Sequence, residues 1–189
     1  MLELTVDSPP TPTARLPWIK ALARRWPTLV ALGMAVLSWG IDTVTAGQLL
    51  PLLPLVYVFA TLIRRRAMSW PILIVVSLGF VLLKSQDVVD PVTVVVATAG
   101  AITVVGLIRS AGRLEMVSQA IGLIIFTGVA MLGLMTAPEV ARWVLATGWV
   151  AHGLWDLVHL RRNAVVSRSY AEWCGVFDIL LGAQLLMSR

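Results

Sequence analysis

The segment AHGLWDLVHLRR (residues 151–162) places three ionisable groups inside an otherwise apolar run. It holds both histidines of the chain, His152 and His159, with Asp156 between them. In a helix these positions follow the spacing i, i+4 and i+7 and point to one side. The run ends at Arg161 and Arg162, which is typical of the cytoplasmic end of a membrane-spanning helix. The segment therefore predicts a transmembrane helix that carries a polar stripe.

The composition of the whole chain extends this interpretation to a polytopic membrane protein. Apolar residues make up 58% of the 189 residues, charged residues only 13%, and the mean hydropathy is +0.87. Soluble domains carry about 25% charged residues, because their surfaces face water. The net charge of +5 lies at the ends of apolar runs, so we expect it to orient the chain in a bilayer rather than to bind nucleic acid.

Seven apolar runs predict an all-α integral membrane protein with a bundle of seven transmembrane helices. Most of the runs reach the roughly 17 residues that cross the hydrocarbon core, and the third is marginal. The second run contains Pro51 and Pro54, which predict either a helix that begins at Pro51 or a kinked span. The runs cover residues 27–44, 47–63, 70–85, 91–108, 115–135, 137–160 and 169–187.

The N-terminal part divides into a tail and a basic segment. Residues 1–12 are rich in Pro, Ser and Thr and predict a disordered tail. Residues 13–26 predict a short amphipathic helix that lies on anionic lipid headgroups. The alternative for this segment is a basic flank that only fixes orientation. Residues 27–189 then form the seven-helix transmembrane domain.

The distribution of basic residues predicts the topology. If each run crosses once and the N-terminus is cytoplasmic, twelve of the fifteen Lys and Arg residues lie inside, and the C-terminus lies outside. Trp26, Trp70 and Trp173 then fall at the inner interface, where indole rings are enriched. We expect a multi-pass protein of the cytoplasmic membrane. The twelve inner residues are Arg15, Lys20, Arg24, Arg25, Arg64, Arg65, Arg66, Arg109, Arg113, Arg161, Arg162 and Arg168.

The last two runs predict a polar intramembrane site. On the final run, Gly175, Asp178 and Gly182 share one stripe, with Cys174 beside it. Small residues let two helices approach closely in lipid, so we expect an antiparallel hairpin joined through this face and the stripe at Gly148. The rise per residue puts His152 and Asp178 at similar depth, which predicts their contact. The predicted site comprises His152, Asp156, His159 and Asp178.

Small residues are expected at helix contacts throughout the fourth to seventh runs, because they permit close backbone approach. These residues are Ala97, Gly100, Gly106, Gly122, Gly128, Gly133, Gly148, Gly175 and Gly182.

Three functions fit the polar site. The first is a proton or ion relay, with proton-linked binding or transport of a small solute. The second is a structural His–Asp clamp in an accessory subunit, partnered by a second copy or another membrane protein. The third is a metal-dependent intramembrane hydrolase. We expect no cofactor and no metal, because one helix rarely presents more than two ligands well and no further histidine exists.

The predicted topology is similar to that of the adiponectin receptor and alkaline ceramidase group. Seven spans, an inner N-terminus and His and Asp residues near the inner leaflet carry the resemblance. That group has zinc-binding histidines, including an H-x-x-x-H pair on its last helix. This chain has no histidine after His159, so the resemblance covers topology alone and implies neither zinc nor amide hydrolysis.

Two further polar features lie at helix ends. Asp42 and Lys84 are predicted at the outer rim, where they form a secondary polar site as an ion pair or contact headgroups separately. Glu139 and Glu172 each lie three residues after a hydroxyl residue, Thr136 and Ser169, which predicts capping boxes. Asp90 before Pro91 similarly predicts an N-cap.

Overall fold

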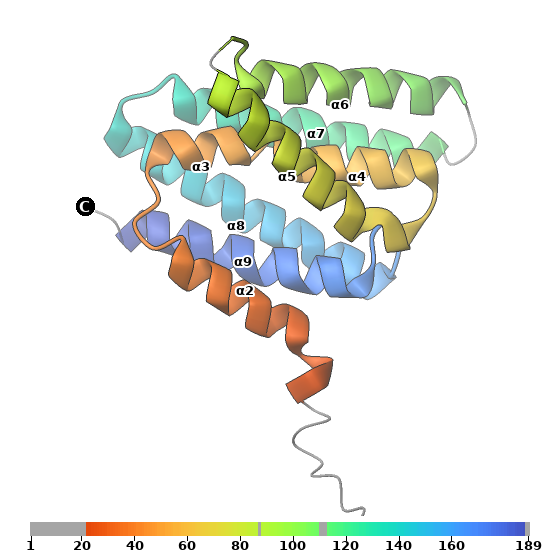
Figure 1. Cartoon of the computed structure of the whole chain (residues 1–189), viewed down its shortest axis with the longest axis horizontal. Helices are drawn as coiled ribbons and strands as arrows, with labels where there is room; N and C mark the ends of the chain where they lie inside the picture. The colour runs from red at the N-terminus through yellow and green to blue at the C-terminus, as the bar shows by residue number, and fades with distance from the viewer. Residues whose placement is uncertain (1–21, 87, 110–112, 188–189) are drawn as a thin grey trace, which may run out of the picture.

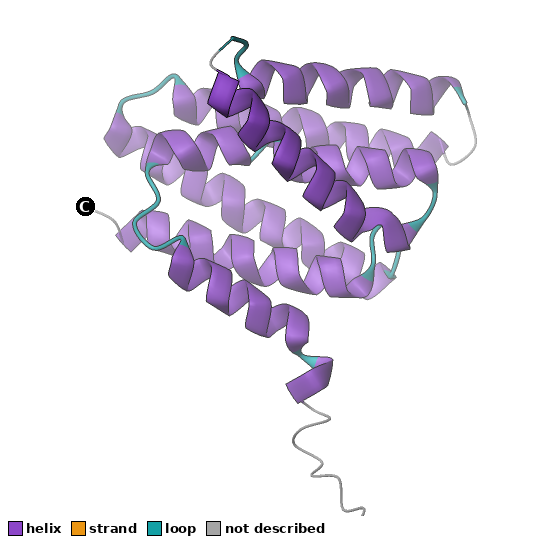
Figure 2. Ribbon diagram, in the orientation of Figure 1, coloured by secondary structure: helices purple, strands orange, loops and turns teal. Residues whose placement is uncertain are grey.

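The computed structural model describes residues 22–86, 88–109 and 113–187, and within these ranges it contains helices and no strands (Figures 1 and 2). The predicted all-helical fold is therefore confirmed. The tail at residues 1–12 and most of the segment 13–26 lie outside the described residues. The helices are α2 (Trp26–Leu37), α3 (Thr43–Leu49), α4 (Leu52–Ile63), η1 (Arg66–Met68), α5 (Ser69–Gln86), α6 (Pro91–Ile108), α7 (Arg113–Leu134), α8 (Pro138–Arg162) and α9 (Arg168–Met187).

Among the described residues, four helical stretches are long and apolar enough to cross a membrane. They are Thr43–Ile63, Arg66–Gln86, Pro91–Ile108 and Arg113–Leu134. The first of the predicted runs is shorter than expected, because α2 has 12 residues and reaches only about 18 Å at 1.5 Å per residue. A hydrocarbon core is about 30 Å thick. The structure thus supports a membrane protein, and α2 by itself is too short for a perpendicular span.

The two prolines of the second run divide it into two helices. Pro51 stands at the N-cap of α4, where its missing N–H costs no hydrogen bond within that helix. Since α3 ends at Leu49, the chain breaks locally and continues in the same general direction (Figure 1). The sequence predicted either a helix that begins at Pro51 or a kinked span. Each prediction is correct in part, because α4 begins next to Pro51 and the stretch from α3 to α4 is interrupted there.

Two of the three predicted helix starts are wrong in their capping residues. Asp90 caps α6 as expected, accepting from the Thr93 amide at 2.8 Å. At α8, however, Ala137 is the N-cap and makes no side-chain cap, while the Thr136 hydroxyl donates to the carbonyl of Gly133 in α7. At α9 the helix begins at Arg168, so the hydroxyl of Ser167 accepts from the Tyr170 amide.

Glu172 does not close a capping box and instead joins α9 to α2. Its Oε1 accepts from the Thr28 hydroxyl at 2.6 Å and from Arg25 Nη1 at 3.2 Å. Helix α2 lies along the outer side of α9 in Figure 1, and this pair fastens one end of that contact.

The core forms where α4, α8 and α9 meet. The largest side chains buried there come from these three helices: Tyr57 of α4, Trp149 of α8 and Tyr170 of α9 are each at most 1% exposed. Helix α5, by contrast, exposes a row of large aliphatic side chains, as expected for a surface in contact with lipid. The exposed α5 side chains are Ile74, Val75, Leu78, Val81 and Leu82.

The predicted hairpin of the last two helices is present, but the small residues that face each other differ in part from the expected stripe. A Cβ on Gly153 would lie 3.0 Å from the Gly175 carbonyl oxygen, and one on Gly182 would lie 2.9 Å from the Ala146 carbonyl oxygen. Gly148 instead packs against Leu50 and a side chain of α7. The backbones of α8 and α9 therefore touch at two levels, as small residues allow.

Of the other predicted small contacts, Gly106, Gly122 and Gly133 lie close to side chains from other helices. Gly100 and Gly128 have open space where a side chain would begin, so these two take no part in packing.

Candidate functional site: a buried His, Asp and Cys cluster

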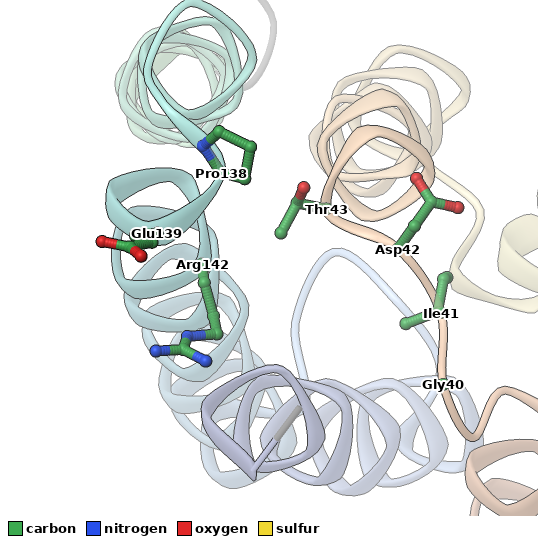
Figure 3. Close-up of a pocket in the computed structure, with 7 residues that line it drawn as sticks. All are labelled: Gly40, Ile41, Asp42, Thr43, Pro138, Glu139 and Arg142. Atoms are coloured by element: carbon green, nitrogen blue, oxygen red, sulfur yellow. The ribbon is translucent and has the colours of Figure 1, made fainter. Parts of the chain in front are cut away.

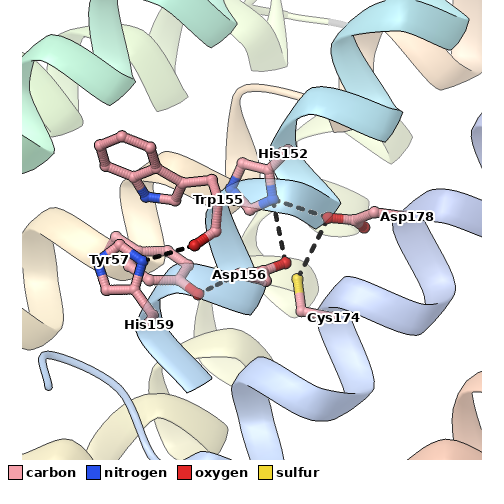
Figure 4. Close-up of polar contacts among 7 residues, drawn as sticks. All are labelled: Tyr57, His152, Trp155, Asp156, His159, Cys174 and Asp178. Carbon is pink, nitrogen blue, oxygen red and sulfur yellow. Dashed lines mark hydrogen bonds and ion pairs between the residues drawn. The ribbon is translucent and has the colours of Figure 1, made fainter. Parts of the chain in front are cut away.

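The predicted contact between His152 and Asp178 is present. His152 Nδ1 lies 2.7 Å from Asp178 Oδ2, and both residues are 0% exposed. Their positions follow from the hairpin, because His152 lies next to Gly153 on α8 and Asp178 lies three residues after Gly175 on α9. The imidazole N–H donates to the carboxylate across the helix interface, as Figure 4 shows.

Asp156 joins the same cluster from one turn along α8. Its Oδ2 lies 3.3 Å from His152 Nδ1, so the imidazole lies between two carboxylates. The other oxygen, Oδ1, accepts a hydrogen bond from the hydroxyl of Tyr57 on α4. Asp156 is therefore held from two sides and is also 0% exposed.

Cys174 completes the cluster from α9. Its thiol lies 3.7 Å from Asp178 Oδ2, one helical turn away, and the residue is fully buried. Ligand atoms of His152, Asp156, Cys174 and Asp178 all lie within 4.8 Å of one another. The four residues form two i, i+4 pairs on facing helices, so one side of each helix supplies two groups.

His159 lies outside this cluster, although sequence spacing placed it on the same stripe. Its Nδ1–H donates to the Trp155 carbonyl at 3.0 Å, and its Nε2 lies 3.2 Å from Gln119 Nε2 of α7. The Tyr57 ring stands between the two regions, 4.8 Å from the His159 ring and 5.7 Å from the His152 ring, centroid to centroid. His159 thus has partners of its own and no ion pair with Asp156 or Asp178.

The sequence alone did not identify Tyr57 and Gln119 as neighbours of the site. Both lie on helices distant in the chain and occupy apolar stretches with no recognisable spacing to the histidines. Their only signal is that a tyrosine or glutamine mid-helix in a membrane protein needs a hydrogen-bond partner.

The secondary site at Asp42 and Lys84 is not an ion pair. Asp42 caps α3, accepting from the amide and hydroxyl of Thr45 at 2.8 and 2.7 Å. The hydrogen bond from the Thr45 amide lowers the pKa of Asp42 below its ordinary value, so the carboxylate stays ionised at neutral pH. Lys84 donates to Gln48 at 3.0 Å instead. Asp42 and Lys84 therefore have separate partners and do not contact each other as an ion pair.

Asp42 also lines an open pocket where the α2–α3 connection meets the start of α8. Figure 3 shows that Asp42, Glu139 and Arg142 point in different directions around this pocket and do not converge on one position. Among the described residues, polar side chains converge in the buried cluster, and none of the cluster residues lines this pocket.

Comparisons with known protein families, curated proteins and solved structures found no match. The chemistry of the cluster is accordingly argued from its geometry alone.

The hydroxyl of Tyr57 is expected to stabilise the fold through Asp156. Tyr57→Phe leaves Asp156 Oδ1 buried without its donor, which should lower the free energy of unfolding by about 1–3 kcal/mol. Tyr170→Phe is the matched control, because Tyr170 is equally buried and its hydroxyl bonds neither carboxylate. Thermal unfolding in detergent measures both variants, and equal losses would contradict the assigned role of Tyr57.

Proposed function

We propose that the chain is a seven-span protein of the cytoplasmic membrane that binds a small cation in the buried cluster between α8 and α9. The N-terminus is cytoplasmic and the C-terminus lies outside. The sequence predicted proton-linked binding or transport of a small solute. We propose that this solute is a cation, because binding of a cation is the function best supported by the charges of the site.

The arrangement of the connections supports this topology. In Figure 1 a first group of helix ends, where α4, α6 and α8 end and α5, α7 and α9 begin, lies at one end of the bundle. The ends of α2, α5 and α7 and the starts of α3, α6 and α8 lie at the other. The first group holds the arginine-rich stretches, in agreement with the positive-inside rule. Trp70 contacts both Trp26 and Trp173, with ring centroids 5.5 and 5.1 Å apart, so the three tryptophans expected at the inner interface cluster together.

Helices α8 and α9 support two further crossings by their length, in addition to the four stretches that are long and apolar enough. They have 25 and 20 residues, so each rises roughly 30 Å or more at 1.5 Å per residue. Their apolar character is reduced by the polar residues of the cluster, which face the bundle interior and are shielded from lipid. Polar groups at such positions are the ones that membrane helices tolerate.

The charge balance of the cluster carries the proposal of cation binding. Two carboxylates, Asp156 and Asp178, share a single imidazole, and all three groups are fully buried. Among the described residues no lysine or arginine is buried, so neither of these permanently charged side chains offsets the second carboxylate. An uncompensated buried charge is costly, and a bound cation removes that cost.

Three other interpretations, a structural clamp, transport and a hydrolase, are less well supported. A structural clamp needs one carboxylate for one imidazole. The pair of His152 and Asp178 is sufficient for it, so a clamp does not explain why Asp156 is buried in the same place. For transport, the described residues on the outer side of the cluster offer the fully buried, apolar Leu145 and Leu181 rather than further titratable groups. A hydrolase needs water and substrate at its ligands, whereas the four side chains of the cluster are enclosed.

Accessibility of introduced cysteines tests the topology. Val88→Cys in the α5–α6 connection should react with a membrane-impermeant maleimide added to intact cells, whereas Arg65→Cys after α4 should react only after lysis. Val88 is 81% exposed, and the parent chain is the control because Cys174 is buried. Labelling of Arg65→Cys from outside would contradict the proposed orientation.

Cation-dependent stability tests the binding function. The full chain is purified in detergent, stripped with a chelator, and melted in a panel of monovalent and divalent cations at constant ionic strength. A cation that binds only the folded state stabilises it by about 2.7 kcal/mol at a hundredfold excess over Kd. For a chain of this size that is a rise in Tm of roughly 5–10 °C.

Two carboxylate variants distinguish cation binding at the cluster from a general effect of salt on stability. Asp178→Asn should abolish the saturable rise in Tm, whereas Asp90→Asn, at an exposed cap, should retain it. If no cation raises the Tm, and Asp178→Asn loses stability as a broken clamp would, the proposed function is refuted.

A further inference from the structure

We propose that His152, Asp156, Cys174 and Asp178 bind one divalent transition-metal ion of the zinc class between α8 and α9. This inference rests on the cation-binding function proposed above and specifies the cation.

The number and placement of the ligands fit a single ion. Zinc sites have four ligands in tetrahedral array, with bonds of about 2.0–2.3 Å, so neighbouring ligand atoms are roughly 3.3–3.8 Å apart. The contacts of 3.3 Å between His152 Nδ1 and Asp156 Oδ2, and 3.7 Å between Cys174 Sγ and Asp178 Oδ2, lie in this range. The contact of 2.7 Å between His152 and Asp178 has to open by about half an ångström. Metal binding also displaces the proton on His152 Nδ1 and the proton of the Cys174 thiol, because these atoms bind a metal only when deprotonated.

The chemical types of the ligands select the class of metal. Magnesium and calcium prefer sites built from oxygen atoms alone. A set of one imidazole nitrogen, one sulfur and carboxylate oxygens favours zinc and neighbouring divalent transition metals. Cys174 is therefore the residue that distinguishes this site from one for an alkali or alkaline-earth cation.

Neighbouring side chains hold the proposed ligands in place but leave carboxylate oxygens of the cluster without a hydrogen-bond partner within the described part of the chain. The Tyr57 hydroxyl donates to Asp156 Oδ1, as outer partners of metal-bound carboxylates do. Asp178 Oδ1 is buried and has no hydrogen-bond partner among the described residues. Asp156 Oδ2, which lies 3.3 Å from His152 Nδ1, is likewise buried without a hydrogen-bond partner among these residues, so a carboxylate oxygen within the cluster is left for a metal ion to bind.

The glycines of the hairpin allow the two ligand pairs to converge. A Cβ on Gly175 would lie 3.2 Å from Asp156 Cβ, and one on Gly153 would lie 3.4 Å from Asp178 Cβ. Larger residues at either position would separate the helices. The same two glycines line a groove beside α2, whose other lining residues include Arg25 and Glu172.

Metal titration of the purified full chain tests the proposal. Chelator-stripped protein in detergent is titrated with Zn²⁺ by calorimetry, and with Co²⁺ as a spectroscopic probe. We expect one ion per chain, and a Co²⁺ spectrum with the intense visible bands of a tetrahedral site and a sulfur-to-metal charge-transfer band. X-ray absorption of the zinc-loaded wild-type chain should report one sulfur among nitrogen and oxygen neighbours, and this measurement needs no variant.

Variants assign the ligands. Cys174→Ser should remove the charge-transfer band, and Asp178→Asn should weaken Zn²⁺ binding at least tenfold. Asp90→Asn, on an exposed cap, should bind as the wild type does. Helical circular dichroism and a monodisperse elution profile show for each variant that the fold is kept.

The outcomes separate this inference from the function on which it rests. Saturable binding of Na⁺, K⁺ or Mg²⁺ without Zn²⁺ binding would overturn the zinc assignment and leave the cation site standing. Binding of Zn²⁺ with no sulfur neighbour in the wild-type chain would overturn the assigned ligand set. Failure of every cation to bind would overturn both proposals.

Discussion

The close approach of α8 and α9 is the constraint on which the rest of the structure depends. Gly153 and Gly182 bring one backbone against the carbonyl oxygens of the other, at distances that leave no room for a side chain. Only at this separation do His152 and Asp178 meet in a hydrogen bond of 2.7 Å. Because the apolar effect does not drive helices together in lipid, this packing and the polar contacts it creates are the main forces that join them.

The burial of the cluster explains how the other helices are arranged. Helix α4 covers the open side of the hairpin and contributes Tyr57 to Asp156, while α2 packs on the outer side of α9 through Glu172. These elements exclude lipid from the two carboxylates, whose exposure to hydrocarbon would cost about 2.5–3.5 kcal/mol each. Helix α5 lies farther from the cluster and accordingly presents aliphatic side chains outward.

Sequence spacing predicted the contact between His152 and Asp178, because helical period and rise per residue fix both the side and the depth of a residue. It failed where tertiary packing decides. His159 lies on the same predicted stripe as His152 but contacts Gln119 of α7. Glu172 was expected to cap α9 and instead accepts a hydrogen bond from Thr28 of α2. The partnership of Tyr57 with Asp156 joins residues 99 positions apart, and no local pattern encodes it. Asp42 followed local capping chemistry, and the ion pair with Lys84, one of the two alternatives drawn from the sequence, is absent.

The most direct test of this account compares alanine at two glycines by thermal or denaturant unfolding in detergent. A methyl group at Gly182 would lie 2.9 Å from the Ala146 carbonyl oxygen and 2.7 Å from a methyl of Val150, whereas at Gly128 it meets open space. We predict that Gly182→Ala lowers the free energy of unfolding by about 1–3 kcal/mol through overpacking. Gly128→Ala should be neutral or stabilising by up to about 1 kcal/mol, since alanine favours the helix. Equal stability of the two variants would contradict the claim that α8 and α9 are in backbone contact.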